Sequence, residues 1–275
     1  MDWTLQAVKV ITRWLGGRRW TLIGDGAYAC VHLAHGCIAQ GVTLISRLRL
    51  DAQLYAFPAP HAPSRRGPKP LKGKRLPSLK ARVQEALAYG KDLDIPWYGG
   101  LTRRVRVLSN IRLWYTPGER PVALRWVLIV DPHGNTAPMA VFSTDVDQPV
   151  AMIIAAFVRR WNIEVTFEET RRHLGVETQR QWSDRAIART TPALFALFSR
   201  VCLMAHRLVA IGQVLPIRAT AWYRKSEATF SDVLAMVSRV LWAEKYFTNS
   251  VDQPKPHVLT PEDWDVLLDQ LASTA

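Results

Sequence analysis

The chain has 275 residues, 48% of them hydrophobic and 21% charged, and this composition excludes a disordered tail and a fibrous protein. Lys and Arg outnumber Asp and Glu by 36 to 23, so the net charge of +13 predicts a polyanionic partner such as nucleic acid. Three scattered cysteines and the absence of a signal-peptide pattern favour a reducing cytoplasm over secretion. The longest uninterrupted apolar run, at 150–158, is about half of a membrane span, so we expect no membrane association.

The first fifty residues predict a helix followed by a strand–helix–strand unit. Apolar residues recur at helical spacing over 3–15, and Gly16-Gly17 ends that helix. We expect a buried strand over 20–24, a helix over about 27–40 and a second strand over 42–46. The short connections favour parallel pairing of the two strands, as in a βαβ unit.

Residues 57–82 differ sharply from their surroundings, because six prolines alternate with basic residues and no acidic residue occurs before Glu85. We expect an extended arm that packs little and that neutralises DNA phosphates without reading their sequence. A solvated linker is the alternative. The arm residues expected to contact DNA are Arg65, Arg66, Lys69, Lys72, Lys74 and Arg75.

Residues 102–143 predict a β-meander with strands near 103–115, 122–131 and 137–143, separated by turns at 117–118 and 132–134. Its arginines at 103, 104 and 106 are further candidates for phosphate contacts. Trp97 and Trp114 fit the core by pattern, with stacking on nucleic-acid bases as the alternative.

The last hundred residues predict helices near 184–211, 231–246 and 261–272, the second of them capped by Ser231. Before them, we expect one long helix from Asp147 to about His173, ended by Gly175. At about 100° per residue, one narrow face of this helix would combine an aromatic residue, two cations and a carboxylate. These residues are Phe157, Arg160, Glu164 and Arg171.

A solvated, salt-bridged surface would also explain such a face. Apolar residues such as Trp161, Val165 and Phe167 are nevertheless spread widely around the helix, whereas an amphipathic surface helix confines them to one stripe. We therefore expect a largely buried helix whose charged face lines a cleft.

The spacing aromatic-x2-Arg-x3-Glu-x6-basic resembles the Tyr/Arg/Glu/Lys signature of a large group of bacterial insertion-sequence DDE transposases, with Phe157 in place of Tyr and Arg171 in place of Lys. The segment from Gly24 to Tyr28 is similar to the context of that family's second catalytic aspartate. The stretches 46–55 and 161–167 also look like family sequence. The resemblance covers about residues 10–210.

This resemblance implies a phosphodiester-cutting and strand-joining chemistry in which carboxylates hold two Mg²⁺ ions. Asp25 would be the second metal ligand and Glu164 the third, while Phe157, Arg160 and Arg171 would contact DNA. The implied partner is double-stranded DNA, bound as transposon ends and target, with a homodimer forming on it. The location implied is the cytoplasm, at the nucleoid.

The resemblance also implies an α/β fold: a partial RNase H-like core, a β-rich insertion subdomain and a helical carboxy-terminal region. The expected domains are a partial core at 1–50, a basic loop and meander at 51–145, core helices at 146–212 and further helices at 213–275. The family's first catalytic aspartate has no counterpart here, because Asp2 precedes a helix and Asp131 follows a meander strand as a turn residue. We therefore expect an amino-terminally truncated transposase that is inactive alone.

Two other interpretations need comparison with this one. A non-catalytic DNA-binding protein, acting as a transposition inhibitor or left as a pseudogene remnant, would share the basic charge. Zinc binding by Cys30, His32, His35 and Cys37 is disfavoured, since a helix over 27–40 would separate the histidines from the cysteines by roughly 140–200°.

Overall fold

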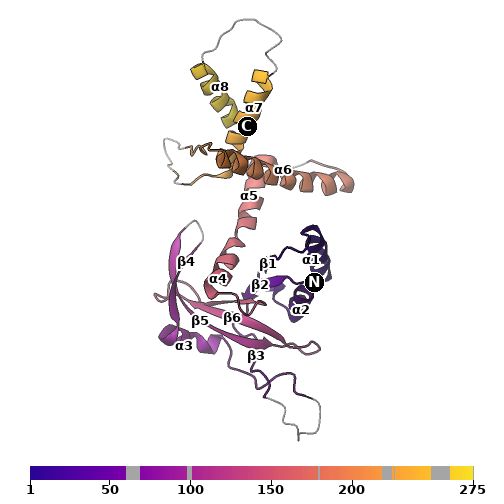
Figure 1. The fold of residues 1–275 in the computed structure, drawn as a ribbon, viewed down its shortest axis with the longest axis vertical. Coiled ribbons are helices and arrows are strands. Elements are labelled where there is room, and N and C mark those ends of the chain that lie inside the picture. The colour runs from indigo at the N-terminus through magenta and orange to yellow at the C-terminus, as the bar shows by residue number, and fades with distance from the viewer. Residues whose placement is uncertain are drawn as a thin grey trace. The chain divides into compact units, whose positions relative to one another are not determined.

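The computed structural model describes residues 1–59, 69–97, 101–178, 180–218, 225, 227–248 and 261–274. The chain divides into two compact units, Met1–Asn162 and Ile163–Ala275. Within the described residues, every strand belongs to the first unit, and the second unit is helical (Figure 1).

The first unit contains four α-helices and two short 3-10 helices among its described residues. These are α1 (Asp2–Trp14), η1 (Gly26–Tyr28), α2 (Val31–Ala39), η2 (Lys80–Arg82), α3 (Val83–Tyr89) and α4 (Val150–Arg159). Its strands are β1 (Thr21–Gly24), β2 (Thr43–Leu48), β3 (Leu54–Tyr55), β4 (Lys91–Pro96), β5 (Thr102–Trp114), β6 (Val122–Val130) and β7 (Met139–Ser143).

These strands form one mixed sheet in the order β1-β2-β7-β6-β5-β3, and β4 pairs with β5 outside this path. β1 and β2 run parallel, with Gly24 opposite Ser46, so the predicted βαβ unit is confirmed. β5, β6 and β7 are antiparallel neighbours, which confirms the predicted meander. The meander joins the βαβ strands through the β2–β7 pair, and the unit is therefore an α/β structure with a continuous sheet.

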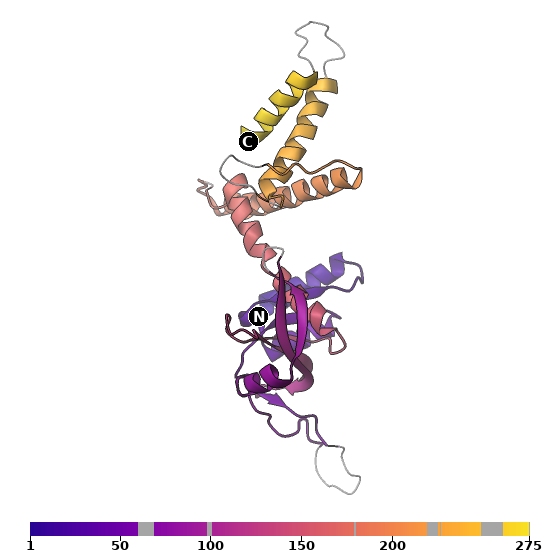
Figure 2. The ribbon, with the colours of Figure 1, turned by 90° about the vertical axis from the view of Figure 1, so that its left-hand side faces the viewer.

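Successive residues of β2 face opposite sides of the sheet. Leu44 and Leu48 belong to a core cluster that includes residues of α1, α2 and α3. Ile45 belongs to a second cluster, built with Ile153 and Phe157 of α4. The helices thus cover two faces of the sheet, and α4 packs over β1, β2, β4 and β7 (Figures 1 and 2).

The basic arm is more firmly held than its composition predicts. In the part of the arm that the structure describes, Gly73 donates a backbone hydrogen bond to Ala56 (2.8 Å) and Leu76 donates one to Leu54 (2.9 Å). Leu79 is 1% exposed, in the core. The expectation of a poorly packed arm is therefore wrong for its carboxy-terminal stem, because backbone pairing to β3 and burial of Leu79 fix the stem.

The predicted long helix over 147–173 is two helices. α4 ends at Arg159, and α5 (Asn162–Leu174) begins three residues later. Arg160 donates to the Phe157 carbonyl (3.1 Å) and Trp161 to the Val158 carbonyl (3.2 Å), so i→i−3 hydrogen bonds tighten the chain there and end α4. The expectation that residues 157–171 share one helical face is therefore wrong.

The second unit contains α6 (Asp184–Ala210), α7 (Phe230–Thr248) and α8 (Pro261–Thr274) in addition to most of α5. α7 packs against both α6 and α8 (Figures 1 and 2). α5 buries Thr170 but leaves Val165 and Phe167 about 40% exposed, so the expectation of a largely buried helix holds for α4 and fails for α5. By length and composition, α6 is the one described helix that meets the criterion for crossing a membrane.

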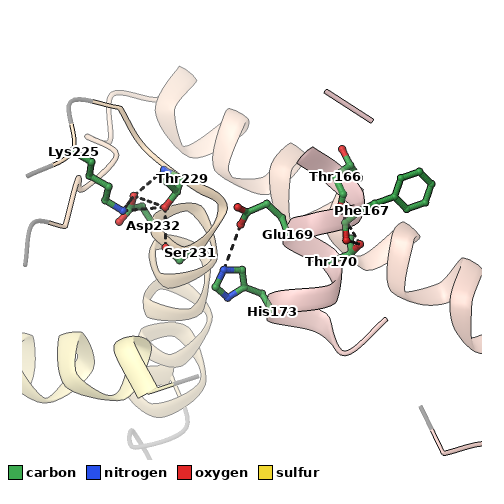
Figure 3. Close-up of polar contacts among 9 residues, drawn as sticks. All are labelled: Thr166, Phe167, Glu169, Thr170, His173, Lys225, Thr229, Ser231 and Asp232. Atoms are coloured by element: carbon green, nitrogen blue, oxygen red, sulfur yellow. Dashed lines mark hydrogen bonds and ion pairs between the residues drawn. The ribbon is translucent and has the colours of Figure 1, made fainter. Parts of the chain in front are cut away.

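A buried carboxylate organises the start of α7. Asp232 is fully buried, receives an ion pair from Lys225 and accepts a hydrogen bond from the Thr229 backbone N–H at 2.9 Å (Figure 3). The Thr229–Asp232 pair therefore caps the helix instead of the predicted Ser231. On α5, His173 Nε2 lies 3.4 Å from Glu169 Oε2 (Figure 3).

Candidate functional site

Asp25 lies immediately after β1, where it caps the 3-10 helix η1. Its Oδ1 atom accepts a hydrogen bond from the Ala27 backbone N–H at 2.9 Å. Within the described part of the chain, its Oδ2 atom accepts no hydrogen bond, and the residue is exposed. Asp25 thus presents a carboxylate oxygen to a ligand at the carboxyl end of a parallel strand.

Two neighbours hold the backbone of Asp25 in place. Ser46 on β2 is fully buried, and its hydroxyl donates a hydrogen bond to the Asp25 carbonyl. Gly24 leaves the space that the Tyr28 side chain fills, since a Cβ atom at residue 24 would lie 2.6 Å from the Tyr28 Cβ. The strand, the turn and η1 therefore form one fixed support for the carboxylate.

A pocket of about 920 Å³ opens beside Asp25, entirely within the first unit. Its charged lining residues come from η1, β2, the segment after β2, η2 and the end of α4. They are Asp25, Arg47, Arg49, Asp51, Lys80 and Arg160. Its larger apolar lining residues are Leu48, Leu50, Met139 and Phe157. We name this the Asp25 pocket.

The charge balance of the Asp25 pocket favours an anion, because four cations face two carboxylates in its lining. One carboxylate is already committed: Asp51 accepts two hydrogen bonds from Arg49, at 2.8 and 2.7 Å. The hydrogen bond from the Arg49 guanidinium lowers the pKa of Asp51. Arg47, Lys80 and Arg160 line the pocket together with the single remaining carboxylate, that of Asp25.

Phe157 and Arg160 reach this pocket from α4 and the turn that follows it. Phe157 is 5% exposed, and the Arg160 guanidinium carbon lies 6.0 Å from its ring centroid. The fold thus brings together Asp25 and two residues of the predicted constellation that lie 132 and 135 positions away in the sequence.

The other two residues of that constellation lie on α5. Glu164 is half-buried in its first turn, and Arg171 is in its last turn, with Nε 3.5 Å from Oε2 of Glu177. Both belong to the second compact unit, whereas the Asp25 pocket belongs to the first. The proximity of Asp25 and Glu164 therefore stays a prediction.

The arginines of the meander are engaged within the protein. Arg103 pairs with Asp131 at 2.7 Å, and the bidentate partners of Arg104 and Arg106 are Asp94 and Asp92. β4 thus supplies cross-strand carboxylates to two of them, and the expected role of these arginines in phosphate contact stays a prediction. Asp131 is the expected turn residue; a hydrogen bond from the His133 N–H, followed by Arg103, lowers its pKa.

The predicted DNA-contact residues of the arm have different surroundings. Lys69, Lys74 and Arg75 are exposed, whereas Lys72 lies against two tyrosine rings, and Arg65 and Arg66 lie outside the described residues.

The remaining candidates have structural contacts. Trp114 is 8% exposed in the core, while Trp97 packs beneath the Arg103 guanidinium at 5.1 Å. His32 Nδ1 lies 3.2 Å from Glu119, and His35 Nε2 lies 2.7 Å from the Arg120 carbonyl.

Sequence reasoning missed two cations of the pocket, Arg47 and Arg49. The alternation Ser-Arg-Leu-Arg-Leu at 46–50 is the signal that could have found both, since it extends the strand predicted over 42–46 and turns both arginines to one face. Lys80 belongs to the arm that was expected to contact DNA, but its place in the pocket has no signal in the sequence, because it depends on how the arm returns to the sheet.

The donor set of the pocket does not by itself fit a pair of Mg²⁺ ions. Mg²⁺ requires oxygen ligands, and Asp25 supplies the one side-chain carboxylate in the lining that no arginine engages. The described residues contain no cluster of three or more His, Cys, Asp or Glu side chains that could hold a metal. An anionic group such as a phosphate fits the lining of the Asp25 pocket better than a pair of Mg²⁺ ions does.

Searches for similarity give no match to any protein-family model or to any curated protein.

Proposed function

We propose that this chain is a catalytic-domain portion of a bacterial insertion-sequence DDE transposase, with an RNase H-like core, and that the Asp25 pocket binds the DNA backbone. The observation that carries the proposal is the meeting of Asp25, Phe157 and Arg160 in one cationic pocket. The motif resemblance assigns these same residues to one site, although 132 positions separate the first two.

In this proposal, the residues of the pocket have distinct tasks. Arg160 donates hydrogen bonds to a phosphate, and the buried Phe157 ring supports its guanidinium. Ser46 and Gly24 hold Asp25 at the mouth of the parallel strand pair. Two Mg²⁺ ions would stabilise the negative charge on the attacking and leaving oxygens. They would bind only if Glu164 and a further carboxylate completed the site.

The open edge of β1 leaves room for a further strand that could complete the metal site. β1 lies at one end of the sheet and pairs with β2, and no other described strand pairs with it. A strand added there would bring its own residues next to Asp25. We propose that the carboxylate missing from the active site, the counterpart of the family's first catalytic aspartate, comes from such a strand and that, without it, the chain cuts no DNA.

The charge balance of the pocket favours a second candidate function as well. A lining of four cations and two carboxylates suits DNA binding without chemistry, as in an inhibitor that competes with an intact transposase for the element ends. The two functions share the DNA-binding step and differ in whether Asp25 and Glu164 act on a metal.

A binding experiment tests the shared step. Duplex affinity is measured over a range of salt concentrations, in EDTA, for the wild type, Arg160→Ala and Asp25→Asn. We expect Arg160→Ala to weaken binding and to reduce the salt slope by about 0.9, the value of one phosphate contact. Asp25→Asn is expected to tighten binding, because it removes a negative charge that faces the phosphate. Unchanged affinities in both variants would exclude the pocket as the DNA site.

A cleavage experiment tests the need for an added strand. The chain is incubated with supercoiled plasmid and Mg²⁺ or Mn²⁺, and we expect no nicking. Nicking that Glu164→Gln abolishes would contradict the need for an added strand, because a carboxylate of this chain would then complete the site. A crystal structure with DNA and Mn²⁺ would test directly whether Asp25 and Glu164 belong to one metal site. The transposase proposal requires their carboxyl groups to lie within roughly 12 Å of each other, since both must bind a pair of ions about 3.5–4 Å apart.

A further inference from the structure

The carboxy-terminal stem of the basic arm, residues 72–80, runs from the far end of β3 to the Asp25 pocket. Its first part pairs with the segment around β3: Ala56 donates to the Lys74 carbonyl at 3.0 Å, and Tyr55 and Arg75 form an antiparallel bridge. Its last part is fixed by the Lys80 N–H, which donates to the Leu50 carbonyl at 3.0 Å. The stem is therefore attached to the sheet at both ends.

Lys72 marks the outer end of the stem. Its Nζ atom lies 3.2 Å from the ring centroid of Tyr115 and 4.0 Å from that of Tyr55, and the two rings meet edge to face. A cation over aromatic faces at these distances is attracted by both rings. Lys72 thus anchors the stem at its outer end.

Lys80 marks the inner end, where its side chain lines the Asp25 pocket together with Arg47. Within the described residues, neither of these side chains has a carboxylate at ion-pair distance, in contrast to Arg49, which pairs with Asp51. Between the two ends, Lys74 and Arg75 are exposed. Cations therefore follow the stem from the arm into the pocket.

The length of the stem suits a single nucleic-acid backbone. The six steps along the chain from Lys74 to Lys80 span at most about 20 Å. Successive phosphates of one DNA strand rise by about 3.4 Å along the duplex, so the stem covers at most about six nucleotides. One strand can therefore contact the outer and inner ends of the stem at the same time.

From this placement, we propose that the stem and the Asp25 pocket bind one continuous DNA strand, with Lys80 contacting the phosphate in the pocket and Lys74 and Arg75 contacting phosphates no more than about six nucleotides away. The stem thereby sets the path of the strand that enters the pocket. This inference rests on the proposed DNA-binding function and adds to it a route for the substrate.

The first test uses the whole chain and a duplex in a salt titration. Lys80→Ala is compared with Lys91→Ala, a matched control because Lys91 is exposed on β4 and does not line the pocket. We expect Lys80→Ala to reduce the salt slope by about 0.9 and Lys91→Ala to leave it unchanged. An unchanged slope for Lys80→Ala, with the wild type binding DNA, would overturn the inference alone.

The second test maps the strand. Lys80→Cys and Arg75→Cys are each labelled with a photo-crosslinker, and the crosslinked nucleotides are identified on the same duplex. We expect both on one strand, separated by at most about six nucleotides. Crosslinks on opposite strands or far apart would overturn the inference and leave the proposed function intact. Absence of DNA binding by the wild type would overturn both.

Discussion

The hydroxyl of Ser46 donates a hydrogen bond to the backbone carbonyl of Asp25, across the parallel pair of β1 and β2. Ser46 is fully buried, so this hydrogen bond connects the interior of the sheet to the carboxylate at its edge. The position of Asp25 therefore depends on a residue that does not itself line the pocket.

Ser46→Ala is expected to lower the free energy of unfolding by about 0.5–1.5 kcal/mol, the usual net value of one hydrogen bond. Ser109→Ala is the control, because Ser109 donates a comparable hydrogen bond to the Trp126 carbonyl (2.7 Å) away from the pocket. Urea unfolding should give similar losses for both variants. Only Ser46→Ala should also weaken DNA binding, and an equal effect of the two on affinity would refute the positioning role.

Gly24→Ala is expected to cost about 1–3 kcal/mol of stability, as overpacked core substitutions do, because the new Cβ would lie 2.6 Å from the Tyr28 Cβ. Gly26→Ala, two residues away, meets no atom within 4 Å and serves as the control. Its expected effect is below about 0.5 kcal/mol, typical of a surface substitution. Thermal and urea unfolding of both variants check the difference, and equal losses would rule out the Tyr28 contact as the cause.

The carboxylate of Asp232 gives the helical unit a defined response to acid. Burial alone raises its pKa, but hydrogen bonds from Lys225, Thr229 and the Arg218 backbone outweigh burial and lower the pKa. Its stabilising effect is therefore complete above the unfolded-state pKa of about 3.9 and is lost as the pH falls through the lower folded-state value.

Asp232→Ala is expected to destabilise the second unit by about 3–5 kcal/mol at neutral pH, because it leaves the Lys225 charge without a partner. The same variant should show a weaker loss of stability on acidification below about pH 4 than the wild type. Asp265→Asn removes an exposed partner of Arg239 and should cost about 0–1 kcal/mol. The measurement is the free energy of unfolding as a function of pH, followed by the circular dichroism signal of the helices. Equal losses of stability in both variants would contradict the role of Asp232.

The sequence predicts much of the sheet and less of the site. Alternation and turn residues locate the βαβ unit and the meander, because each strand carries its own local pattern. The helix α3 and the strand β4 were not predicted, although Lys91-Asp-Leu-Asp-Ile95 alternates as an edge strand does. The charges at 92 and 94 become understandable once their partners, Arg106 and Arg104, are known from the strand register.

The break after α4 could not be predicted from the spacing of residues. The sequence from Phe157 to Arg171 keeps a helical spacing, although the backbone tightens at Arg160 and Trp161. Asp25 was found from its motif context. The position of Lys80 in the pocket depends on how the arm folds back onto the sheet, and the local sequence pattern does not predict this.

The most direct test of the central claim, that the Asp25 pocket holds DNA, is photocrosslinking from inside it. Met139 lines the pocket, whereas Tyr89 on α3 is 81% exposed and does not line it. Each is replaced in turn by p-benzoylphenylalanine in the whole chain, and the protein is irradiated with a labelled duplex. We predict crosslinking from position 139 that is competed away by unlabelled DNA, and little crosslinking from position 89. Efficient crosslinking from position 89 and none from position 139, in a chain that binds DNA, would contradict the claim.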